Sequence, residues 1–322
     1  MASARVAYQG YAESNADLGL PALPDIGDIS SLLDGSTDQY AWYRSADQWR
    51  ADVLTTAGET DTYQYGDLST FEWDYGSNML TQIVGTEPVR LPRAADLLPP
   101  ELGRRLLSYA GKHARVSVLP GLRVGGVDAA GIRLETPSAA TIVTAVDIWA
   151  DPRTGLPLEV QVFCRGQAAP VLVSQFLEVS FAQPSVATIT PPEPGPTTGF
   201  DIAGLPDVER ILHGYGPPLP ASLGGTSRAA GVAGLPDVAA YGSGFGRFAV
   251  IPLPRGAGAT VLQAATAAGT TVQLGSGTAV VIQTPLLTVL LAPTLGGPVY
   301  LLTGTVTAAT LERAALQLPD NA

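Results

Sequence analysis

The fold class is decided by one stretch of the chain, Asp147-Ile148-Trp149-Ala150-Asp151-Pro152-Arg153-Thr154-Gly155-Leu156-Pro157-Leu158-Glu159-Val160. In its centre, Asp151 can accept turn hydrogen bonds, Pro152 presets φ for a type I turn, and Gly155 can adopt the left-handed conformation that closes the turn. Alternation along the flanking strands can place four apolar residues on one face of a sheet: Trp149, Leu156, Leu158 and Val160. The stretch therefore predicts an antiparallel hairpin with one buried face.

Further short strands surround this hairpin and are separated by turn residues. Large apolar residues alternate with small or polar ones, which is the period-two pattern of a half-buried sheet. The expected strands are 40–44, 49–53, 60–65, 69–75, 79–84, 122–127, 131–135, 141–150, 156–163 and 171–181. Helical interruptions are expected at Asp25–Leu33 and within Ala94–Tyr109, the latter starting firmly at Pro100 or Glu101 because Pro99-Pro100 splits the pattern. This order predicts a curved or barrel-like antiparallel meander.

A proline-rich break, Thr190-Pro191-Pro192-Glu193-Pro194-Gly195-Pro196, follows these strands. Prolines lack N–H donors, so this segment cannot form a helix or a central strand. Beyond it the tail predicts strands at 245–253, 271–274, 279–284, 286–292 and 299–304, with helices at 260–268 and 308–318. Thr307 is expected to cap the last helix. The predicted organisation is a first domain at 1–190, a Pro/Gly-rich linker at 191–240, and a small α+β domain at 241–322.

Charge and composition exclude several functional classes. The net charge is −11, and 18 basic residues, of which only Lys112 is a lysine, face 29 acids. Nucleic-acid binding needs clustered basic residues, so it is excluded as a general function. No apolar run reaches the roughly 18 residues of a membrane-spanning helix. The first residues lack the features of a signal peptide, although a chain that begins just after a removed signal sequence or lipid anchor would look the same.

Catalytic and metal-binding patterns are sparse. Two histidines, His113 and His213, and one cysteine, Cys164, offer no zinc spacing, and solvated histidines with a buried cysteine are the favoured interpretation. The run Gly242-Ser243-Gly244-Phe245-Gly246 precedes a strand, whereas a nucleophile elbow needs a strand before the serine and a helix after it. The spacing of the acidic residues alone does not exclude a pair of carboxylates for glycoside cleavage. The sequence predicts no enzyme, no cofactor and no metal.

The hairpin resembles the W-x-D-x-x-T-G-L-P-L segment of the RseB/MucB family, whose fold is related to the lipoprotein carrier LolA. Other pieces resemble that family in the same order: 6–11, 49–54, 122–127 with 133–134, 176–181, 241–250 and 304–311. The composition, rich in Ala, Arg and Gly, resembles an actinobacterial member. The chain departs from the family pattern at Ser243 and Gly244, and at Thr305 and Thr307. These positions lie in the domain that touches the anti-sigma factor in RseB, which leaves the identity of the partner open.

The resemblance implies a fold of the α+β class, a LolA-like curved antiparallel half-barrel with helices in its concavity, followed by a small α+β domain. It implies an extracytoplasmic lipoprotein or secreted protein, made with a signal peptide, that binds an acyl chain or a lipidated protein and takes part in sigma factor regulation through a membrane-bound anti-sigma factor. The residues expected to line the ligand cavity are Trp42, Trp49, Phe71, Trp73, Trp149, Leu158 and Val160. The alternatives are a lipid carrier that serves an exporter, a structural surface protein, and a surface hydrolase.

Overall fold

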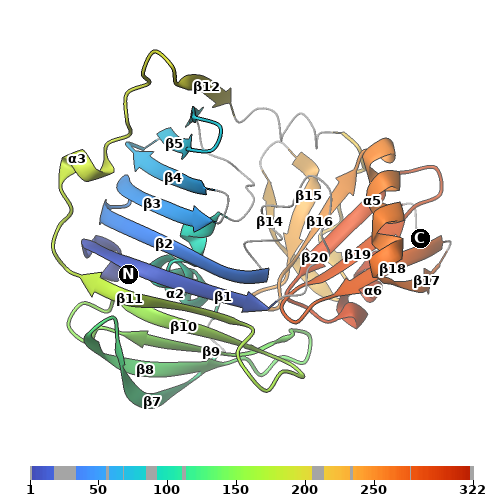
Figure 1. Cartoon of the computed structure of the whole chain (residues 1–322). Helices are drawn as coiled ribbons and strands as arrows, with labels where there is room; N and C mark the ends of the chain where they lie inside the picture. Colours follow the sequence, from blue (N-terminus) through green and yellow to red (C-terminus); the bar gives the residue numbers. More distant parts are fainter. Residues whose placement is uncertain are drawn as a thin grey trace.

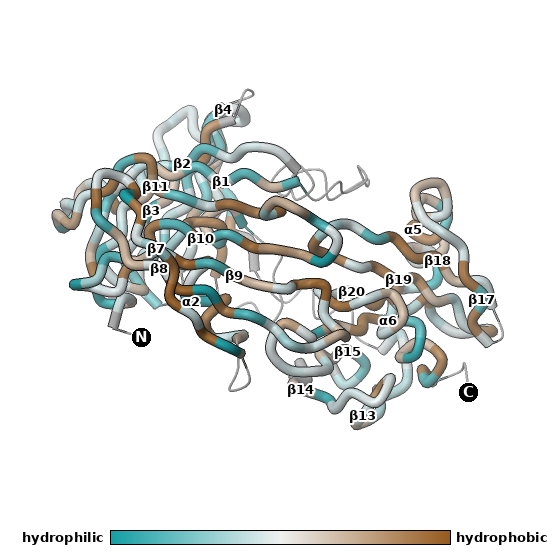
Figure 2. Tube along the Cα trace, turned by 90° about the horizontal axis from the view of Figure 1, so that it is seen from below, coloured by the Kyte–Doolittle hydropathy of each residue, from teal (hydrophilic) through white to brown (hydrophobic). Residues whose placement is uncertain are grey.

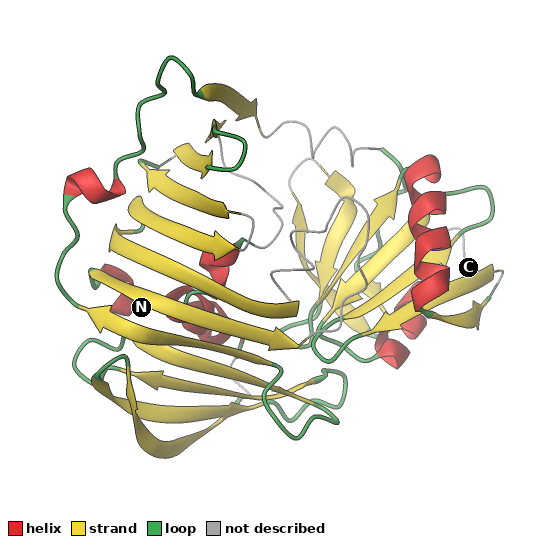
Figure 3. Ribbon diagram, viewed as in Figure 1, coloured by secondary structure: helices red, strands yellow, loops and turns green. Residues whose placement is uncertain are grey.

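The structure is a computed structural model that describes residues 2–17, 34–55, 58–67, 69–84, 93–110, 114–204, 214–232, 235–275 and 277–319. The helix expected at 25–33 lies outside these residues. The described strands form two sheets with few helices, one of 12 strands and one of 8 (Figures 1 and 3). The chain is thus mostly β, with large, open and predominantly antiparallel sheets, as the strand pattern predicts.

The 12-stranded sheet runs in the order β12-β6-β5-β4-β3-β2-β1-β11-β10-β9-β8-β7 and is strongly curved (Figure 1). Its strands are β1 (Tyr8–Asp17), β2 (Asp34–Ser45), β3 (Gln48–Thr55), β4 (Gly58–Tyr65), β5 (Ser69–Asp74), β6 (Met79–Val84), β7 (Arg115–Val124), β8 (Val127–Glu135), β9 (Val143–Ala150), β10 (Pro157–Cys164), β11 (Leu172–Ser180) and β12 (Gly199–Gly204). All pairs are antiparallel except β12 with β6. Three short helical segments accompany the sheet: η1 (Ala2–Arg5), η2 (Ala94–Leu97) and α3 (Val186–Ile189).

The predicted hairpin is formed by β9 and β10. Thr154 Oγ1 donates to Asp151 Oδ2 at 2.7 Å, and Gly155 has a φ of 71°, as the turn chemistry requires. A bulge between Pro157 and Glu159 shifts the register, so that Glu159 pairs with Trp149 and Val160 pairs with Ile148. The bulge breaks strict alternation. The four apolar residues expected on one face are therefore divided between two buried clusters, with Val160 apart from the other three.

Helix α2 (Pro99–Tyr109) packs against β10 and β11 and defines what we call the α2 face of the sheet. Both prolines fit its first turn, where an N–H is not needed, so the helix starts one residue before the expected position. Gly103 allows the close approach, because a Cβ there would lie 2.8 Å from Pro157 Cβ. Aliphatic residues from the helix and the strands form the core beneath it: Leu97, Leu102, Val146, Ile148, Val160, Val162 and Leu172.

The 8-stranded sheet runs in the order β13-β14-β15-β16-β20-β19-β18-β17. Its elements are β13 (Ser222–Leu223), β14 (Thr226–Val232), β15 (Leu235–Tyr241), β16 (Phe248–Leu253), α5 (Arg255–Ala268), β17 (Thr270–Leu274), β18 (Gly277–Gln283), β19 (Thr288–Pro293), β20 (Val299–Gly304) and α6 (Ala308–Ala315). The segment expected as a linker, 191–240, includes β12, β13, β14 and most of β15. The proline run itself lies outside these strands. The division into independent domains stays a prediction.

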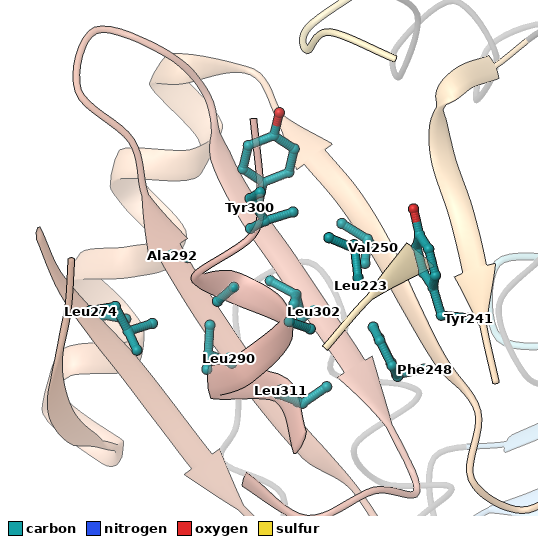
Figure 4. Packing of buried hydrophobic residues seen from close by; sticks show 14 of the residues in the cluster. Leu223, Tyr241, Phe248, Val250, Leu274, Leu290, Ala292, Tyr300, Leu302 and Leu311 are labelled. Atoms are coloured by element: carbon teal, nitrogen blue, oxygen red, sulfur yellow. The ribbon is translucent and has the colours of Figure 1, made fainter. Parts of the chain in front are cut away.

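Helices α5 and α6 cover opposite faces of this second sheet. Along β18, Val280 belongs to the cluster under α5, whereas Val281 belongs to the cluster under α6. Strands covered on both faces read as continuous apolar runs, and β18, β19 and β20 include such stretches (Figure 2). In the α6 cluster, Tyr241 stacks on Phe248 at 5.4 Å beside Leu302 and Leu311 (Figure 4). None of the helices described is long and apolar enough to cross a membrane.

Direct contacts join the two sheets. The Thr141 hydroxyl donates to the Thr305 carbonyl at 2.7 Å, and Thr141 forms an isolated bridge with Val306. Arg247 lies over the Tyr109 ring at 5.5 Å, at the end of α2. Thr307 is the N-cap residue of α6, but its hydroxyl lies 3.0 Å from that of Thr310 and makes no side-chain cap, contrary to the expectation from sequence.

Candidate functional site

A cavity of about 500 Å³ lies over the α2 face on the β1–β6 half of the first sheet. Six of its lining residues form one cross-strand row, in which each residue pairs with the next on the neighbouring strand. The row consists of Tyr8, Tyr43, Trp49, Gln64, Thr70 and Ile83. Directly paired residues project on the same side of a sheet. The curvature and register of six strands therefore build the floor, which we call the cavity row.

The opposite wall comes from η2 and the first turns of α2. It includes Ala95, Leu98, Glu101 and Arg104, and η1 adds Ala4. Ligand pockets for small molecules typically span roughly 300–1,000 Å³ and combine apolar walls with a few polar groups. This cavity agrees with that description in size and in its mixture of aromatic, aliphatic and charged residues.

Aromatic stacking organises the floor. The Tyr8 and Tyr43 rings stack with centroids 5.2 Å apart, and the Tyr43 hydroxyl donates to the Ala4 carbonyl at 2.9 Å. Burial raises the pKa of both phenols, so they stay neutral at physiological pH. On the wall, Arg104 lies over the Tyr43 ring at 5.7 Å and pairs with Glu101 at 3.0 Å. The stacked aromatic part of the floor is thus neutral. Charged residues line the cavity both from the helical wall, as Glu101 and Arg104 do, and from the strand side, as Arg50 and Asp67 do.

Two of the seven predicted lining residues, Trp42 and Trp49, border this cavity. Trp49 belongs to the cavity row. Trp42 lies one residue along β2 from that row, and its ring packs under the Arg50 guanidinium, 5.1 Å from the ring centroid. Phe71 is in register with Tyr63, whose other cross-strand partner, Arg50, also pairs with Trp42. Alternation therefore places Trp42 and Phe71 on the face opposite the cavity row, which we call the outer face.

The other four predicted residues are not part of the cavity lining. Trp73 is paired with Asp61 and also lies on the outer face. Trp149, Leu158 and Val160 are buried in the hydrophobic core, and Trp149 donates its indole N–H to the Pro120 carbonyl at 3.0 Å. Sequence reasoning missed Tyr8, Tyr43, Gln64 and Thr70. These residues lie on other strands and join Trp49 only through cross-strand pairing, which can be assigned only when the register of the strands is known.

The outer face carries a buried charged group. Arg50 donates to Asp52 at 2.5 Å and to Asp61 at 2.8 Å, and Tyr63 donates to Asp61 at 2.9 Å. One oxygen each from Asp52, Glu59 and Asp61 lies within 4.8 Å of the others, which is an arrangement that could hold a metal ion. Burial raises the pKa of all three carboxyls, and mutual repulsion adds to the effect. The Arg50 guanidinium already provides a positive charge to this group.

The candidate nucleophiles take structural positions. Cys164 is buried in β10, and burial raises the pKa of its thiol to about 12, as expected of a small core residue. The glycine run 242–246 forms the turn before β16, with positive φ at Gly242 and Gly244. His113 and His213 lie outside the described residues. A second hollow of about 420 Å³ borders β7 to β10 and includes Arg115 and Arg133, the latter bound to Asp147 through two hydrogen bonds.

Known structures resemble this fold over the whole chain. No protein-family model and no curated protein matches the sequence. The complex of MucA and MucB from Pseudomonas aeruginosa superposes with a TM-score of 0.53 and 17% identity, covering 100% of this chain and 95% of that one. A crystal structure of MucB with MucA(peri) gives a TM-score of 0.53 and 16% identity, with coverages of 100% and 96%. The chain therefore has an RseB/MucB-like fold, which confirms the resemblance drawn from the hairpin.

Proposed function

We propose that this chain is a non-catalytic, extracytoplasmic binding protein that holds an acyl chain, free or attached to a protein, in the cavity. In this proposal the protein also regulates a membrane-bound anti-sigma factor. The observation that carries the proposal is the cavity row, an uncharged floor beneath a helix in which Tyr8, Tyr43, Trp49 and Ile83 accompany the polar side chains of Gln64 and Thr70. In this proposal the hydrocarbon contacts the aromatic and aliphatic part of a lining that also includes polar and charged residues.

The chemistry of the floor supports an acyl ligand. Tyr8, Tyr43, Trp49 and Ile83 provide apolar surface, and Leu98 contributes it from the wall. Each methylene group that a ligand buries contributes roughly 0.8 kcal/mol, so a long chain can bind without a polar anchor. Because the phenols stay neutral, covering them with hydrocarbon does not remove a charge from water. An acyl chain is therefore the ligand class that this surface favours.

The partner and the cellular location are proposed from similarity of fold. MucB has been solved in complex with MucA, and this chain shares its fold over the full length. The contacts of Tyr109 and Thr141 with the second sheet join the cavity half of the molecule to the half that we propose meets the partner. We propose an extracytoplasmic location, by secretion or through a lipid anchor, and the similarity of fold to MucB supports it.

The test compares two adjacent residues on β6 that lie on opposite faces. Ile83 belongs to the cavity row, whereas Gln82 pairs with Phe71 on the outer face. We expect Ile83→Trp to fill the cavity and weaken the binding of a fluorescent fatty acid at least about tenfold, the equivalent of 1.4 kcal/mol. Gln82→Trp adds the same side chain to the same strand and leaves binding unchanged.

Binding is measured by fluorescence titration and by native mass spectrometry of the protein after incubation with fatty acid. Absence of fatty-acid binding to the wild-type protein would overturn the proposal. An equal loss of affinity in both variants would also contradict it, because the ligand would then bind elsewhere. Far-UV circular dichroism of each variant confirms that it is folded before the comparison is made.

A further inference from the structure

Strand β7 forms one edge of the 12-stranded sheet, and no described element lies beyond it (Figure 1). Its first half is unusually apolar for an exposed edge: Val116 is 64% exposed and Val118 is 86% exposed. An edge strand presents unpaired backbone N–H and C=O groups and is a template for pairing with another strand. Natural proteins protect such edges with proline, charges or bulges.

Strand β7 begins with one charged residue, Arg115, and its proline and its register shift come only after residue 119. Pro120 interrupts the strand, and the register with β8 shifts between Leu119 and Leu122. Residues 115–119, Arg-Val-Ser-Val-Leu, carry neither feature. The open edge is therefore five residues long and has Ser117 at its centre.

The apolar surface of this edge continues from the core. Val116 pairs with Leu134 on β8, and Val118 pairs with Ile132. Leu134 is buried in the cluster under α2, and Ile132 packs against that cluster. Each row of apolar side chains thus begins in the core and ends in solvent at a valine.

We propose that this edge pairs with the same edge of a second copy of the chain, forming an antiparallel, two-fold symmetric dimer centred on Ser117. In that register Val116 of each copy faces Val118 of the other, so both apolar rows continue across the axis from Leu134 to the second copy's Ile132. Ser117 faces Ser117, and Arg115 faces Leu119. An isologous contact of this kind requires a self-complementary surface, and the five residues provide it.

Electrostatics supports the same register. The two Arg115 side chains are offset by four residues, about 14 Å along the strands, which exceeds a Debye length of about 8 Å. Strand β7 contains Arg115 and Arg123 and no acid, although the chain has a net charge of −11. Two acidic molecules therefore meet at a basic strand, where their repulsion is weakest. The cavity row lies at the other end of the sheet order and stays open in this dimer.

Sedimentation velocity across low to high micromolar concentration tests the proposal with the full chain. We expect the wild-type protein to self-associate reversibly to a dimer and Val118→Lys to weaken the association at least about tenfold, because the change occurs twice per dimer. Leu295→Lys is the matched control. Leu295 is 75% exposed, lies between β19 and β20, and is expected to leave the dimer intact.

A second measurement tests the register. Paired residues have Cβ atoms about 4.5–5.5 Å apart, which is close to disulfide geometry, so Ser117→Cys should cross-link rapidly under glutathione disulfide. Ser138→Cys, an exposed serine outside β7, serves as the control. A wild-type protein that stays monomeric would overturn the proposal, even if a different protein were found to pair with this edge. So would a dimer that is insensitive to Val118→Lys or that cross-links no faster through residue 117 than through 138.

Discussion

The two halves of the first sheet use the same face in different ways. On β8–β11 the α2 face consists of aliphatic residues such as Val146, Val160 and Val162, and α2 fills the space above them. On β1–β6 the same face consists of Tyr43, Trp49, Gln64 and Thr70, and the helix borders a cavity instead of filling it. One helix of 11 residues covers only part of a curved sheet of 12 strands.

The residue composition of a sheet face therefore depends on whether a helix covers that face. Strand positions packed against a helix are β-branched or aliphatic, because close packing rewards a matched shape. Positions that face an open hollow mix aromatic rings with hydroxyl and amide groups, which tolerate both water and a ligand. A mixed row on an otherwise aliphatic face therefore marks the site better than aromatic residues do alone.

The largest expected effect is a loss of stability in the closed half, by which we mean β8–β11 with the face that α2 covers. The open half is β1–β6, whose face borders the cavity. Ile148→Ala should lower the free energy of unfolding by about 2–5 kcal/mol, since Ile148 is buried in the cluster under α2 and its truncation leaves a void. Ile83→Ala in the open half should cost less than about 1.5 kcal/mol, because the side chain is only partly buried and borders an existing cavity. Urea unfolding of both variants checks the contrast. Equal costs would show that the two halves are packed alike.

The outer faces of the two halves differ in charge balance. On β8–β9, Arg133 meets Asp147 in a one-to-one pair, whereas on β3–β4 the single Arg50 meets Asp52 and Asp61 with Glu59 nearby. Burial, with repulsion between the carboxylates added to it, raises the pKa of these three acids above their ordinary values. The folded protein therefore binds protons more readily than the unfolded chain at this site.

This imbalance predicts an effect of intermediate size that depends on pH. A raised folded-state pKa contributes stability that is present below the ordinary carboxyl pKa of about 4 and is lost as pH rises through the raised value. The Asp61→Asn variant lacks one of these titrating carboxyls and should lose less stability as pH rises. Its free energy of unfolding relative to that of the wild type should therefore increase from pH 4 to pH 7. Thermal unfolding across this range tests the sign. A relative stability that falls with rising pH would contradict the raised pKa of Asp61.

Local chemistry allowed much of the fold to be predicted. The β9–β10 hairpin follows from its turn residues, and β6 from alternation between Met79 and Val84. The strand expected at 122–127 was placed wrongly, because Gly125 and Gly126 form a left-handed turn between β7 and β8. In the site, Trp42 and Trp49 border the cavity. Trp42, Phe71 and Trp73 nevertheless lie on the outer face, and Trp149, Leu158 and Val160 lie in the core. The face of a strand residue depends on register and bulges, which involve distant segments that a single sequence does not align.

The smallest expected change in stability comes from a substitution in the cavity row, in the open half of the sheet. Thr70→Val replaces a hydroxyl of the cavity row with a methyl group of similar shape and removes the hydrogen bond from Thr70 Oγ1 to Gln64 Oε1, which is 3.0 Å long. The free energy of unfolding should change by less than about 1.5 kcal/mol, the net value of one hydrogen bond. The floor becomes more like that of the closed half, so the fluorescent fatty acid should bind about as tightly as before or up to several-fold tighter.

Thr60→Val, a similar change farther along the neighbouring strand β4 and outside the cavity lining, is the control and should leave the affinity unchanged. Weaker binding by Thr70→Val alone would mean that the ligand needs the hydroxyl, and that the cavity recognises a polar group rather than hydrocarbon.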